Sequence, residues 1–373
     1  MHRAALPPLT IWAARTFGTA AHSLAALRHN PDHRTVRLLV SHVRAESPTL
    51  GTADRAFLEP PLTGPAWVGW ALEVCERENV DVLWVTHEAV AAAAAREAFA
   101  AVGTRLLLPS AGALLRTSAK SEVYRRAEAI GLPTPPWERI VGVRRAKAAL
   151  RRLERLSPHG VCVKPDSGQG AVGVWRLVPG WDDLPSGVDL PLRLWLAHVR
   201  RNPDAAWLVL PWLPGAEHSV DALRSRDGRL LASVVRTKRD SSSEQVASSD
   251  PRLTTMSAAL LENLAVSPLA NVQWRDQEGS PVLLEVNPRP SAGLFRSSQA
   301  LGIDLLWAAI RQEVLGDAGL ASGPVALADG VVLRTTSLAS VVPMAVLTSV
   351  APAAGPAALP SQLSPRAAEQ LSP

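Results

Sequence analysis

One segment, residues 271–289 (NVQWRDQEGSPVLLEVNPR), constrains the fold and the chemistry of this chain more than any other. Two runs rich in apolar residues flank a short stretch of turn residues, Glu-Gly-Ser at 278–280. That arrangement is typical of a β-hairpin, because glycine supplies the backbone conformations that a tight reversal needs. The segment therefore predicts two antiparallel strands, over residues 271–276 and 281–287.

Polar side chains of this hairpin are predicted to converge on one face. Successive residues of a strand point to opposite faces, so Glu285 and Asn287 point the same way. A connection of odd length, such as residues 278–280, places Gln273 opposite Glu285, whereas an even connection points Gln273 away. With the odd connection, one carboxylate and two amide oxygens gather beside Arg289. These are oxygen ligands that suit Mg²⁺ bridging nucleotide phosphates, whereas an unpaired carboxylate in an apolar run is costly.

The motifs NVQ and LLEVNPRP in this segment resemble the metal-binding signature of the ATP-grasp superfamily. Their sequence is most similar to that of the carbamoyl-phosphate synthetase large chain and related ligases. The resemblance covers about residues 10–310. It implies that Gln273, Glu285 and Asn287 hold Mg²⁺ or Mn²⁺ on ATP. It also implies that Arg289 contacts the transferred phosphate as a catalytic residue.

Composition indicates a globular chain. Its 373 residues are 47% hydrophobic and 20% charged, which is enough for two or three domains with cores. There is no run of about 18 apolar residues, and the first residues are too short and too rich in proline for a secretory signal. We therefore expect no membrane partner. Cys75 and Cys162 lie in apolar surroundings and are expected to be reduced, which predicts a cytoplasmic location.

The net charge of +5 raises the alternative of a nucleic-acid partner. Arginine carries nearly all of the positive charge, and no basic stripe is interleaved with aromatic residues. We therefore expect no nucleic-acid partner, since the same charge suits ATP and an anionic substrate. The four lysines of this arginine-rich chain are Lys120, Lys147, Lys164 and Lys238. They are informative because three of them, Lys120, Lys164 and Lys238, fall at candidate phosphate-binding positions.

Residues from about 9 to 110 alternate between strand and helix patterns, which predicts a parallel sheet in a βαβ layout. The turn after the first strand holds the single Gly18 rather than GxGxxG. In the ATP-grasp superfamily this position is filled by a Rossmann-like domain that often contributes to the second substrate's site. His87 and Glu88 follow the third strand at the sheet edge where ligands bind, with a plain helix start as the alternative.

A helix is predicted over residues 110–130, ended by the Gly-Leu-Pro that follows it. The stretch KSEVYRRAEAIGLPTPPW resembles the superfamily's entry into the ATP-grasp domain, and this implies that Lys120 reaches nucleotide phosphate. The Asp that commonly precedes this lysine is Ala119 here. A solvated helix lysine is the alternative reading.

A glycine-rich loop follows a strand that ends at Lys164. Gly168 and Gly170 allow backbone N–H groups to approach phosphate, and the lysine supplies a point charge. The loop is not a Walker loop, because no GK[ST] follows. It resembles the lid that ATP-grasp proteins place over the triphosphate, with a simple hairpin loop as the alternative.

The apolar run 207–211 leads into WLPGAEHSVD, which resembles the hinge where the superfamily reads adenine through backbone groups. The resemblance implies that Leu210 and Trp212 flank adenine and that Glu217 binds the ribose. The acid that often opens this hinge is replaced by Leu210, so adenine contacts are expected to rely on the backbone. A core position is the alternative for Trp212.

The strand pattern LASVVRTKR at 231–239 ends in three cations. Arg236 and Lys238 share one face of that strand. Similar ligases keep an arginine here near phosphate or the acyl-phosphate, so the resemblance implies a catalytic role for Arg236 and a nucleotide contact for Lys238. Residues 240–250 are expected to form a mobile loop.

Taken together, the sequence predicts an α/β protein, with an α+β arrangement in its ATP-grasp part. Residues 1–112 are expected to form the Rossmann-like domain, 113–335 the ATP-grasp domain with a lid at about 135–206, and 336–373 an Ala/Pro-rich tail. The implied activity is an ATP-dependent, ADP-forming ligase that joins a small-molecule carboxylate to an amine or other nucleophile through an acyl-phosphate. A carboxylase, a carbamoyl-phosphate type enzyme and a non-catalytic nucleotide-binding protein remain alternatives, and the resemblance allows a homodimer.

Overall fold

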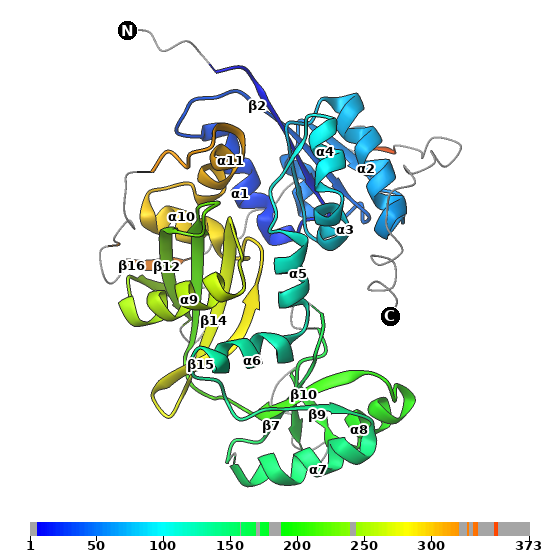
Figure 1. Cartoon of the computed structure of the whole chain (residues 1–373), viewed down its shortest axis with the longest axis vertical. Helices are drawn as coiled ribbons and strands as arrows, with labels where there is room; N and C mark the ends of the chain where they lie inside the picture. The colour runs from blue at the N-terminus through cyan, green and yellow to red at the C-terminus, as the bar shows by residue number, and fades with distance from the viewer. Residues whose placement is uncertain are drawn as a thin grey trace. The chain divides into compact units, whose positions relative to one another are not determined.

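The computed structural model describes residues 6–156, 158–168, 172–178, 188–238, 244–320, 327, 331–334 and 347–349. These residues form two compact units (Figure 1). The first unit contains residues 6–28, 32–106 and 347–349, and the second contains residues 29–31 and the described residues from 107 to 334. Among the residues that are described, no helix has both the length and the apolar character needed to cross a membrane.

A parallel β-sheet organises the first unit, as the alternating pattern predicted. The strand order is β17-β3-β2-β1-β4-β5, and each neighbouring pair is parallel. The chain builds β2 and β3 on one side of β1 and then crosses to add β4 and β5 on the other, so the topology reverses between β1 and β4. The strands are β1 Leu9–Ala14, β2 Val36–His42, β3 Arg55–Leu58, β4 Val82–Val85, β5 Arg105–Leu106 and β17 Leu347–Ser349.

Aromatic side chains form the core of this unit. Trp12 of β1 lies 5.8 Å from Phe57 of β3 and 5.6 Å from Trp70 of the helix α2, measured between ring centroids. The Trp12 indole N–H donates to Ser41 Oγ at 2.7 Å, which satisfies its only polar atom. The helices of the unit are α1 Ala21–Ala26, α2 Gly64–Glu78, α3 Ala89–Ala94 and α4 Arg96–Ala101, with 3₁₀ turns η1 Gly18–Ala20, η2 Leu27–His29 and η3 Pro48–Thr52.

The second unit contains a five-stranded sheet in the order β6-β10-β7-β8-β9. The helices α7 and α8 bury Leu150 and Trp195 against Trp207 of this sheet. Both helices carry arginine on their other positions, which accounts for the run of basic residues in this part of the sequence. The elements are β6 Glu138–Val141, α7 Val143–Leu153, η4 Glu154–Leu156, β7 Val161–Pro165, β8 Trp175–Val178, β9 Asp189–Pro191, α8 Leu192–Arg201 and β10 Ala206–Pro211.

A second, antiparallel sheet of this unit has the order β15-β14-β11-β12-β13-β16. One apolar cluster joins the two sheets, because it contains Leu208 of β10, Tyr124 of α6 and Trp274 of β14. Figure 1 shows α6 between the two sheets. The elements are α5 Ala111–Ser118, α6 Lys120–Ala129, β11 Glu217–Arg224, β12 Leu230–Lys238, β13 Glu244–Ser248, α9 Pro251–Asn263, β14 Leu269–Gln277, β15 Ser280–Asn287, α10 Leu294–Leu301, α11 Leu305–Leu315 and β16 Val331–Arg334.

Two short strands lie in segments that the sequence assigned to a mobile loop and to the tail. Glu244–Ser248 falls in the predicted mobile loop, yet it forms β13 and pairs with both β12 and β16. Leu347–Ser349 falls in the predicted tail, yet it forms β17 and pairs in parallel with β3. The expectation of a mobile loop was wrong for residues 244–248, because a short strand is stabilised by the sheet it joins, and composition does not show that partner.

The hairpin of β14 and β15 has the predicted pairing for a different reason. Its turn is the two-residue Glu278-Gly279, with φ of 52° and 79°, so the connection is even and the odd-loop prediction is wrong. Gln273 nevertheless lies opposite Glu285, because a bulge adds one residue, Leu284, between Leu283 and Glu285. The bulge therefore restores the register that an even turn would have lost.

Candidate active site

The three predicted metal ligands lie together on the β14–β15 hairpin. Gln273 is the cross-strand neighbour of Glu285, and Asn287 is two residues further along β15. All three are half-buried. The Asn287 amide donates to Glu285 Oε1 at 2.8 Å, and the Arg289 guanidinium is 3.4 Å from Asn287 Oδ1. The hairpin thus presents one carboxylate and two amides beside a cation, as the sequence predicted.

This set of donors fits Mg²⁺ only in company with other oxygens. Within the part of the chain that the structure describes, no three His, Cys, Asp or Glu side chains cluster as metal ligands. Mg²⁺ is commonly held by one or two carboxylates together with substrate phosphates and waters. Glu285 and the neighbouring amides therefore suit a Mg²⁺ ion whose remaining ligands are phosphate oxygens of a bound polyphosphate.

The bulge also creates a binding site for the predicted lysine of β7. Lys164 is buried, and its ammonium donates to the carbonyl of Leu284 at 2.9 Å and to the Tyr124 hydroxyl at 3.0 Å. The Tyr124 hydroxyl donates to the same carbonyl at 3.0 Å. Because Leu284 is the extra residue of the bulge, its carbonyl is available to groups outside the ladder. One peptide oxygen thus connects α6, β7 and β15 next to Glu285.

The charge of Lys164 is maintained despite its burial. Burial acts to lower the pKa of Lys164, but Tyr124, Cys162 and Glu285 act to raise it, so the pKa lies above its ordinary value. Burial likewise lowers the pKa of Lys120, with Glu285 acting in the opposite direction and Lys164 adding to the decrease. Lys120 also donates to the Gly168 carbonyl at 3.1 Å. Both lysines therefore lie within electrostatic reach of the predicted metal-binding carboxylate.

The predicted lid loop is described only in part. Gly168 has a φ of +121°, a conformation that is open to glycine and disfavoured for other residues. Gly170, the second glycine predicted to approach phosphate, lies outside the described residues.

The predicted helix over 110–130 is broken at Ala119, which is extended with φ of −106° and ψ of 123°. Ala119 pairs with Ser167, and the Lys120 amide donates to the Asp166 carbonyl at 2.8 Å. The Asp166 carboxylate accepts from the Ser121 amide at 2.8 Å and from the Ser121 hydroxyl at 2.9 Å. Asp166, the residue after β7, thus supplies the helix cap that Ala119 cannot provide.

Asp166→Asn is expected to lower the unfolding free energy by about 1–3 kcal/mol at pH 7. Burial acts to raise the pKa of Asp166, but the Ser121 amide and Arg139 hold it below its ordinary value. An aspartate whose pKa is lower in the folded state than in the unfolded state stabilises the fold at pH values above its unfolded-state pKa, which is about 3.9. The difference between wild type and variant should therefore shrink as the pH falls through the folded-state pKa.

Urea unfolding of both proteins at neutral and acidic pH measures this effect. Asp204→Asn, at an exposed position, is the matched control and should leave the curves unchanged. An Asp166 variant as stable as wild type at pH 7 would contradict the capping role.

The predicted adenine-binding hinge follows the edge of β10. Pairing of β10 with β6 ends at Val209, whereas pairing with β7 continues through Leu210 to Pro211. The Leu210 side chain is buried in the shared core, so only its backbone can face a ligand. That adenine contacts rely on the backbone here stays a prediction.

Trp212 is half-buried, and its ring lies near two cations. The guanidinium carbons of Arg176 and Arg275 are 5.3 and 5.9 Å from its ring centroid. Its amide donates to the Gly160 carbonyl at 2.8 Å, which anchors the hinge to the start of β7. The core alternative for Trp212 is therefore incomplete, because the ring also contacts charged side chains.

The structure brings the predicted ribose ligand Glu217 together with Lys238. These two side chains form an ion pair between β11 and β12, and Arg275 approaches Glu217 at 3.9 Å. Glu217 was predicted to bind the ribose, and Lys238 was predicted to contact the nucleotide. Their pairing places both where β11 begins and β12 ends, at one end of the two central strands of the antiparallel sheet.

Arg236 is in a setting that the sequence did not indicate. It is buried, and its guanidinium donates to the Asp221 carboxylate at 2.8 and 3.0 Å. It also bonds to the side chains of Ser219, Gln245, Ser291 and Ser297. A Cβ on Gly293 would lie 2.2 Å from its guanidinium carbon, so glycine is required there. Arg236 thus anchors the segment that follows Arg289.

Several residues of this site were missed or undervalued by the sequence reading. Tyr124, the only tyrosine in the chain, lies one helical turn after Lys120, and that spacing was the available signal. Asp166 lies two residues after Lys164, but its role depends on a contact with a distant helix. Asn271 donates to Ser219 Oγ and Asp221 Oδ1, each at 2.9 Å, and nothing in the local pattern indicates this.

Comparison with solved structures shows the fold of the chain. N5-carboxyaminoimidazole ribonucleotide synthetase in its ADP complex matches with a TM-score of 0.62 and 17% identity, over 89% of this chain and 82% of that chain. Biotin carboxylase from Campylobacter jejuni, as a β-γ-ATP complex, matches with 0.62 and 15%, over 84% and 72%. The biotin carboxylase domain dimer of Hydrogenobacter thermophilus 2-oxoglutarate carboxylase, with MgADP, ADP and bicarbonate, matches with 0.60 and 13%, over 83% and 70%. The chain has the mixed α/β fold of the ATP-grasp superfamily.

A sequence comparison matches a family model to part of the chain. Residues 204–332 match the family described as "ATP-grasp in the biosynthetic pathway with Ter operon". The matched region includes Glu217, Arg236 and the whole β14–β15 hairpin. No curated protein sequence matches the chain significantly. The resemblance to the ATP-grasp superfamily is therefore confirmed.

Proposed function

We propose that this chain is an ATP-dependent ligase that activates a small-molecule carboxylate as an acyl-phosphate and transfers it to an amine or another nucleophile. The observation that carries the proposal is the hairpin face of Gln273, Glu285 and Asn287, with Lys164 fixed beside it by the Leu284 carbonyl. Solved neighbours support it, because one is a synthetase bound to ADP and another contains MgADP and bicarbonate. ATP with Mg²⁺, or Mn²⁺ in its place, is the proposed cofactor pair.

The side chains of the proposed site form two groups, the metal ligands and the positively charged lysines. Gln273, Glu285 and Asn287 would hold the metal, which when bound neutralises phosphate charge and orients the transferred group. Lys120 and Lys164 offer fixed positive charge close to that carboxylate. The protein's contribution is then to position the reactants and stabilise charge in a site prepared in advance.

Arg289 is proposed to act on the transferred phosphate. Burial lowers its pKa, while Glu285 and Asp221 act in the opposite direction. Arg236 is proposed to support it indirectly, because it holds Ser291 and the residues that follow Arg289. Glu217 and Lys238 are proposed to meet the ribose side of the nucleotide, and Leu210 and Trp212 its adenine.

A carboxylating reaction is the second candidate. It is favoured by the bicarbonate in one of the carboxylase structures to which the chain is similar. Both candidates consume ATP and form ADP, so they differ only in the acid that is activated.

ADP formation with Mg²⁺ and ATP across a panel of carboxylates, amines and bicarbonate tests the proposal. We expect ADP only when an acid is present, and expect chelation of Mg²⁺ to abolish it. Dependence on bicarbonate would favour the second candidate. A protein that MgATP stabilises against heat but that forms no ADP with any acid would instead be a nucleotide-binding protein, and the ligase proposal would fail.

A further inference from the structure

The positive charge of this chain is concentrated on two helices. The helix α7 with the 3₁₀ turn η4 that follows it, and the helix α8, contain nine lysines and arginines and one acid, Glu154, which gives them a net charge of +8. Because the whole chain has a net charge of +5, all its other residues together sum to −3. A general enrichment in arginine does not account for such an uneven distribution.

All nine cations are exposed, because both helices direct their apolar residues into the core. Arg144, Arg151 and Arg155 recur at intervals of seven and four residues, so they form one stripe on the side of α7 opposite the buried Leu150 and Leu153. The other exposed cations are Arg145, Lys147 and Arg152 of α7, and Arg193, Arg200 and Arg201 of α8. We call the surface formed by these nine side chains the basic face.

The two helices of the basic face lie side by side on one face of the β6-β10-β7-β8-β9 sheet (Figure 1). The helix α7 contacts β6 and β10, whereas α8 contacts β8 and β9, and the two helices also contact each other. Leu150 of α7 and Trp195 of α8 belong to one core cluster beneath them. Their outward-facing cations therefore form a single surface.

The basic face is on the side of this sheet that faces away from the proposed nucleotide site. Val163 and Trp207 pack against α7 and α8, whereas their neighbours Cys162 and Leu208 belong to the apolar cluster shared with the antiparallel sheet. Lys164 follows the same alternation and reaches the bulge of β15 on that second side. The nine cations are therefore not positioned to bind the phosphates of ATP.

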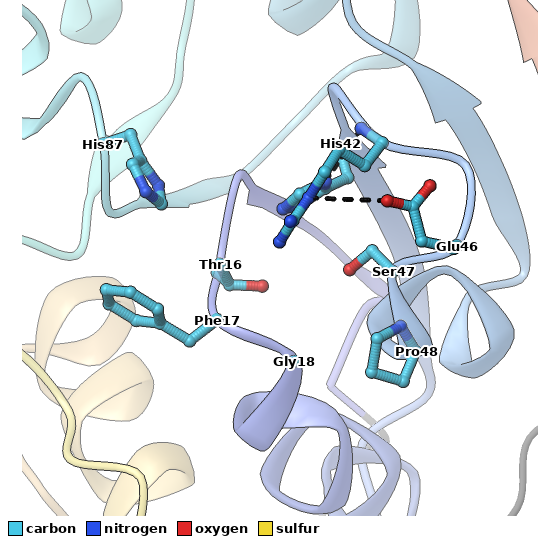
Figure 2. A pocket seen from close by; sticks show the side chains of 9 residues that line it. Thr16, Phe17, Gly18, His42, Glu46, Ser47, Pro48 and His87 are labelled. Carbon is cyan, nitrogen blue, oxygen red and sulfur yellow. Dashed lines mark hydrogen bonds and ion pairs between the residues drawn. The ribbon is translucent and has the colours of Figure 1, made fainter. Parts of the chain in front are cut away.

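The pocket of the first unit does not account for the charge either. Figure 2 shows this pocket, which is lined by nine residues that include His87. Among the lining residues Arg44 is the only arginine or lysine, and its guanidinium lies 3.7 Å from the Glu46 carboxylate. The lining therefore carries no excess of positive charge, in contrast to the basic face.

We propose that the basic face binds the sugar-phosphate backbone of a nucleic acid duplex without reading its sequence. Guanidinium groups bind phosphate through paired hydrogen bonds, and such backbone contacts supply nearly all the affinity of non-specific binding. The stripe from Arg144 to Arg155 extends about 16 Å along α7, a length over which a duplex presents roughly ten phosphates. Arg152 is paired with Glu138, whereas the stripe arginines form no ion pair with any residue that the structure describes. The proposal goes beyond the ligase assignment and does not depend on it.

The composition of the basic face favours a duplex over other anionic partners. Among the described side chains of α7, η4 and α8, Leu194 is the only large apolar one that is exposed. A membrane-surface helix inserts an apolar face, and a protein interface uses apolar or aromatic anchors, but these helices have buried theirs in the core. We expected no nucleic-acid partner because aromatic residues are not interleaved with the cations. That absence disfavours stacking on single strands, but a duplex exposes its phosphates and needs only cations.

Fluorescence anisotropy of short labelled DNA and RNA duplexes, titrated with the full chain, tests the proposal. We expect saturable binding that is independent of base sequence, with an affinity whose logarithm falls linearly with the logarithm of salt concentration. A preference for one duplex would identify the natural partner as DNA or RNA. At constant ionic strength and free Mg²⁺, saturating MgATP should leave the affinity unchanged. Competition by MgATP would place the nucleic acid in the nucleotide site and overturn the proposal.

A triple variant of the stripe tests whether the basic face is the binding surface. Arg144→Glu, Arg151→Glu and Arg155→Glu together lower the net charge from +5 to −1, because each substitution changes it by −2. We expect the duplex affinity to fall at least about tenfold. The salt slope should also decrease by about 2–3, since each phosphate contact contributes ~0.9 to it. Lysine at the same three positions should retain most of the affinity, because it keeps the charge.

A second triple variant with the same net charge is the matched control. It reverses three exposed arginines outside the basic face, Arg125→Glu, Arg229→Glu and Arg252→Glu, and should retain most of the affinity. Circular dichroism should show that both triple variants are folded. Equal loss of affinity in the two variants, or no duplex binding by the wild type at low salt, would refute the proposal. Binding to phosphatidylglycerol vesicles but not to either duplex would assign the face to a membrane surface instead.

Discussion

Glu285→Gln is expected to lower the rate of Mg²⁺-dependent ADP formation by roughly 10²–10³-fold, the loss typical of removing one fixed electrostatic group from an active site. Glu285 is the only carboxylate among the three proposed metal ligands, and it is placed opposite Gln273 by the bulge. Glutamine keeps the volume and can still accept from Asn287, which donates to Oε1 at 2.8 Å. The variant therefore removes the charge that attracts the cation and little else.

Three measurements define the outcome. Steady-state ADP formation should fall, and MgATP should no longer raise the melting temperature, while circular dichroism should be unchanged. Glu278→Gln is the matched control, because it removes the same charge from the exposed turn of the same hairpin. It should behave as wild type. A Glu285→Gln enzyme with full activity and an intact response to MgATP would show that this hairpin face does not hold the metal.

The hairpin shows how much of the site could be predicted. Side-chain alternation places Glu285 and Asn287 on one face, and this depends only on their spacing. The pairing with Gln273 depends on the number of residues between the strands, and here the turn is even while a bulge at Leu284 supplies the extra residue. A bulge depends on what lies around the strand, and Lys164 with Tyr124 binds the carbonyl that it frees. Neither residue is near Leu284 in the sequence.

Contacts between distant segments also explain the remaining differences between the predicted and the observed structure. The helix over 110–130 was predicted as continuous, because its composition favours a helix throughout. Asp166 ends that continuity by capping a new helix at Ser121. Arg236 was read as facing a substrate, because a strand pattern shows which residues share a face but not what covers it. Asp221 and Ser297 cover it in the structure.

Lys164→Met is expected to reduce kcat/KM for MgATP by about 10²-fold, because it removes a fixed positive charge beside Glu285. The pKa of Lys164 is raised, so the wild-type side chain stays charged throughout any practical assay range. The defect should therefore be equal at every pH between about 6 and 9. A defect that disappeared at one end of this range would indicate that the charge of Lys164 is not what turnover requires.

The same variant tests whether Lys164 is structural instead. Methionine fills a similar volume and loses two hydrogen bonds, but it also avoids the cost of burying an ammonium, so the unfolding free energy should change by only about 1–2 kcal/mol. The Tyr124 hydroxyl still bonds to the Leu284 carbonyl, so the bulge and the pairing of Gln273 with Glu285 should survive. Lys147→Met, on the exposed face of α7, is the matched control for the substitution. Urea unfolding and ADP formation measured on both variants separate the roles: a Lys164→Met protein that unfolds readily but turns over normally would make this lysine a structural bridge between the sheets.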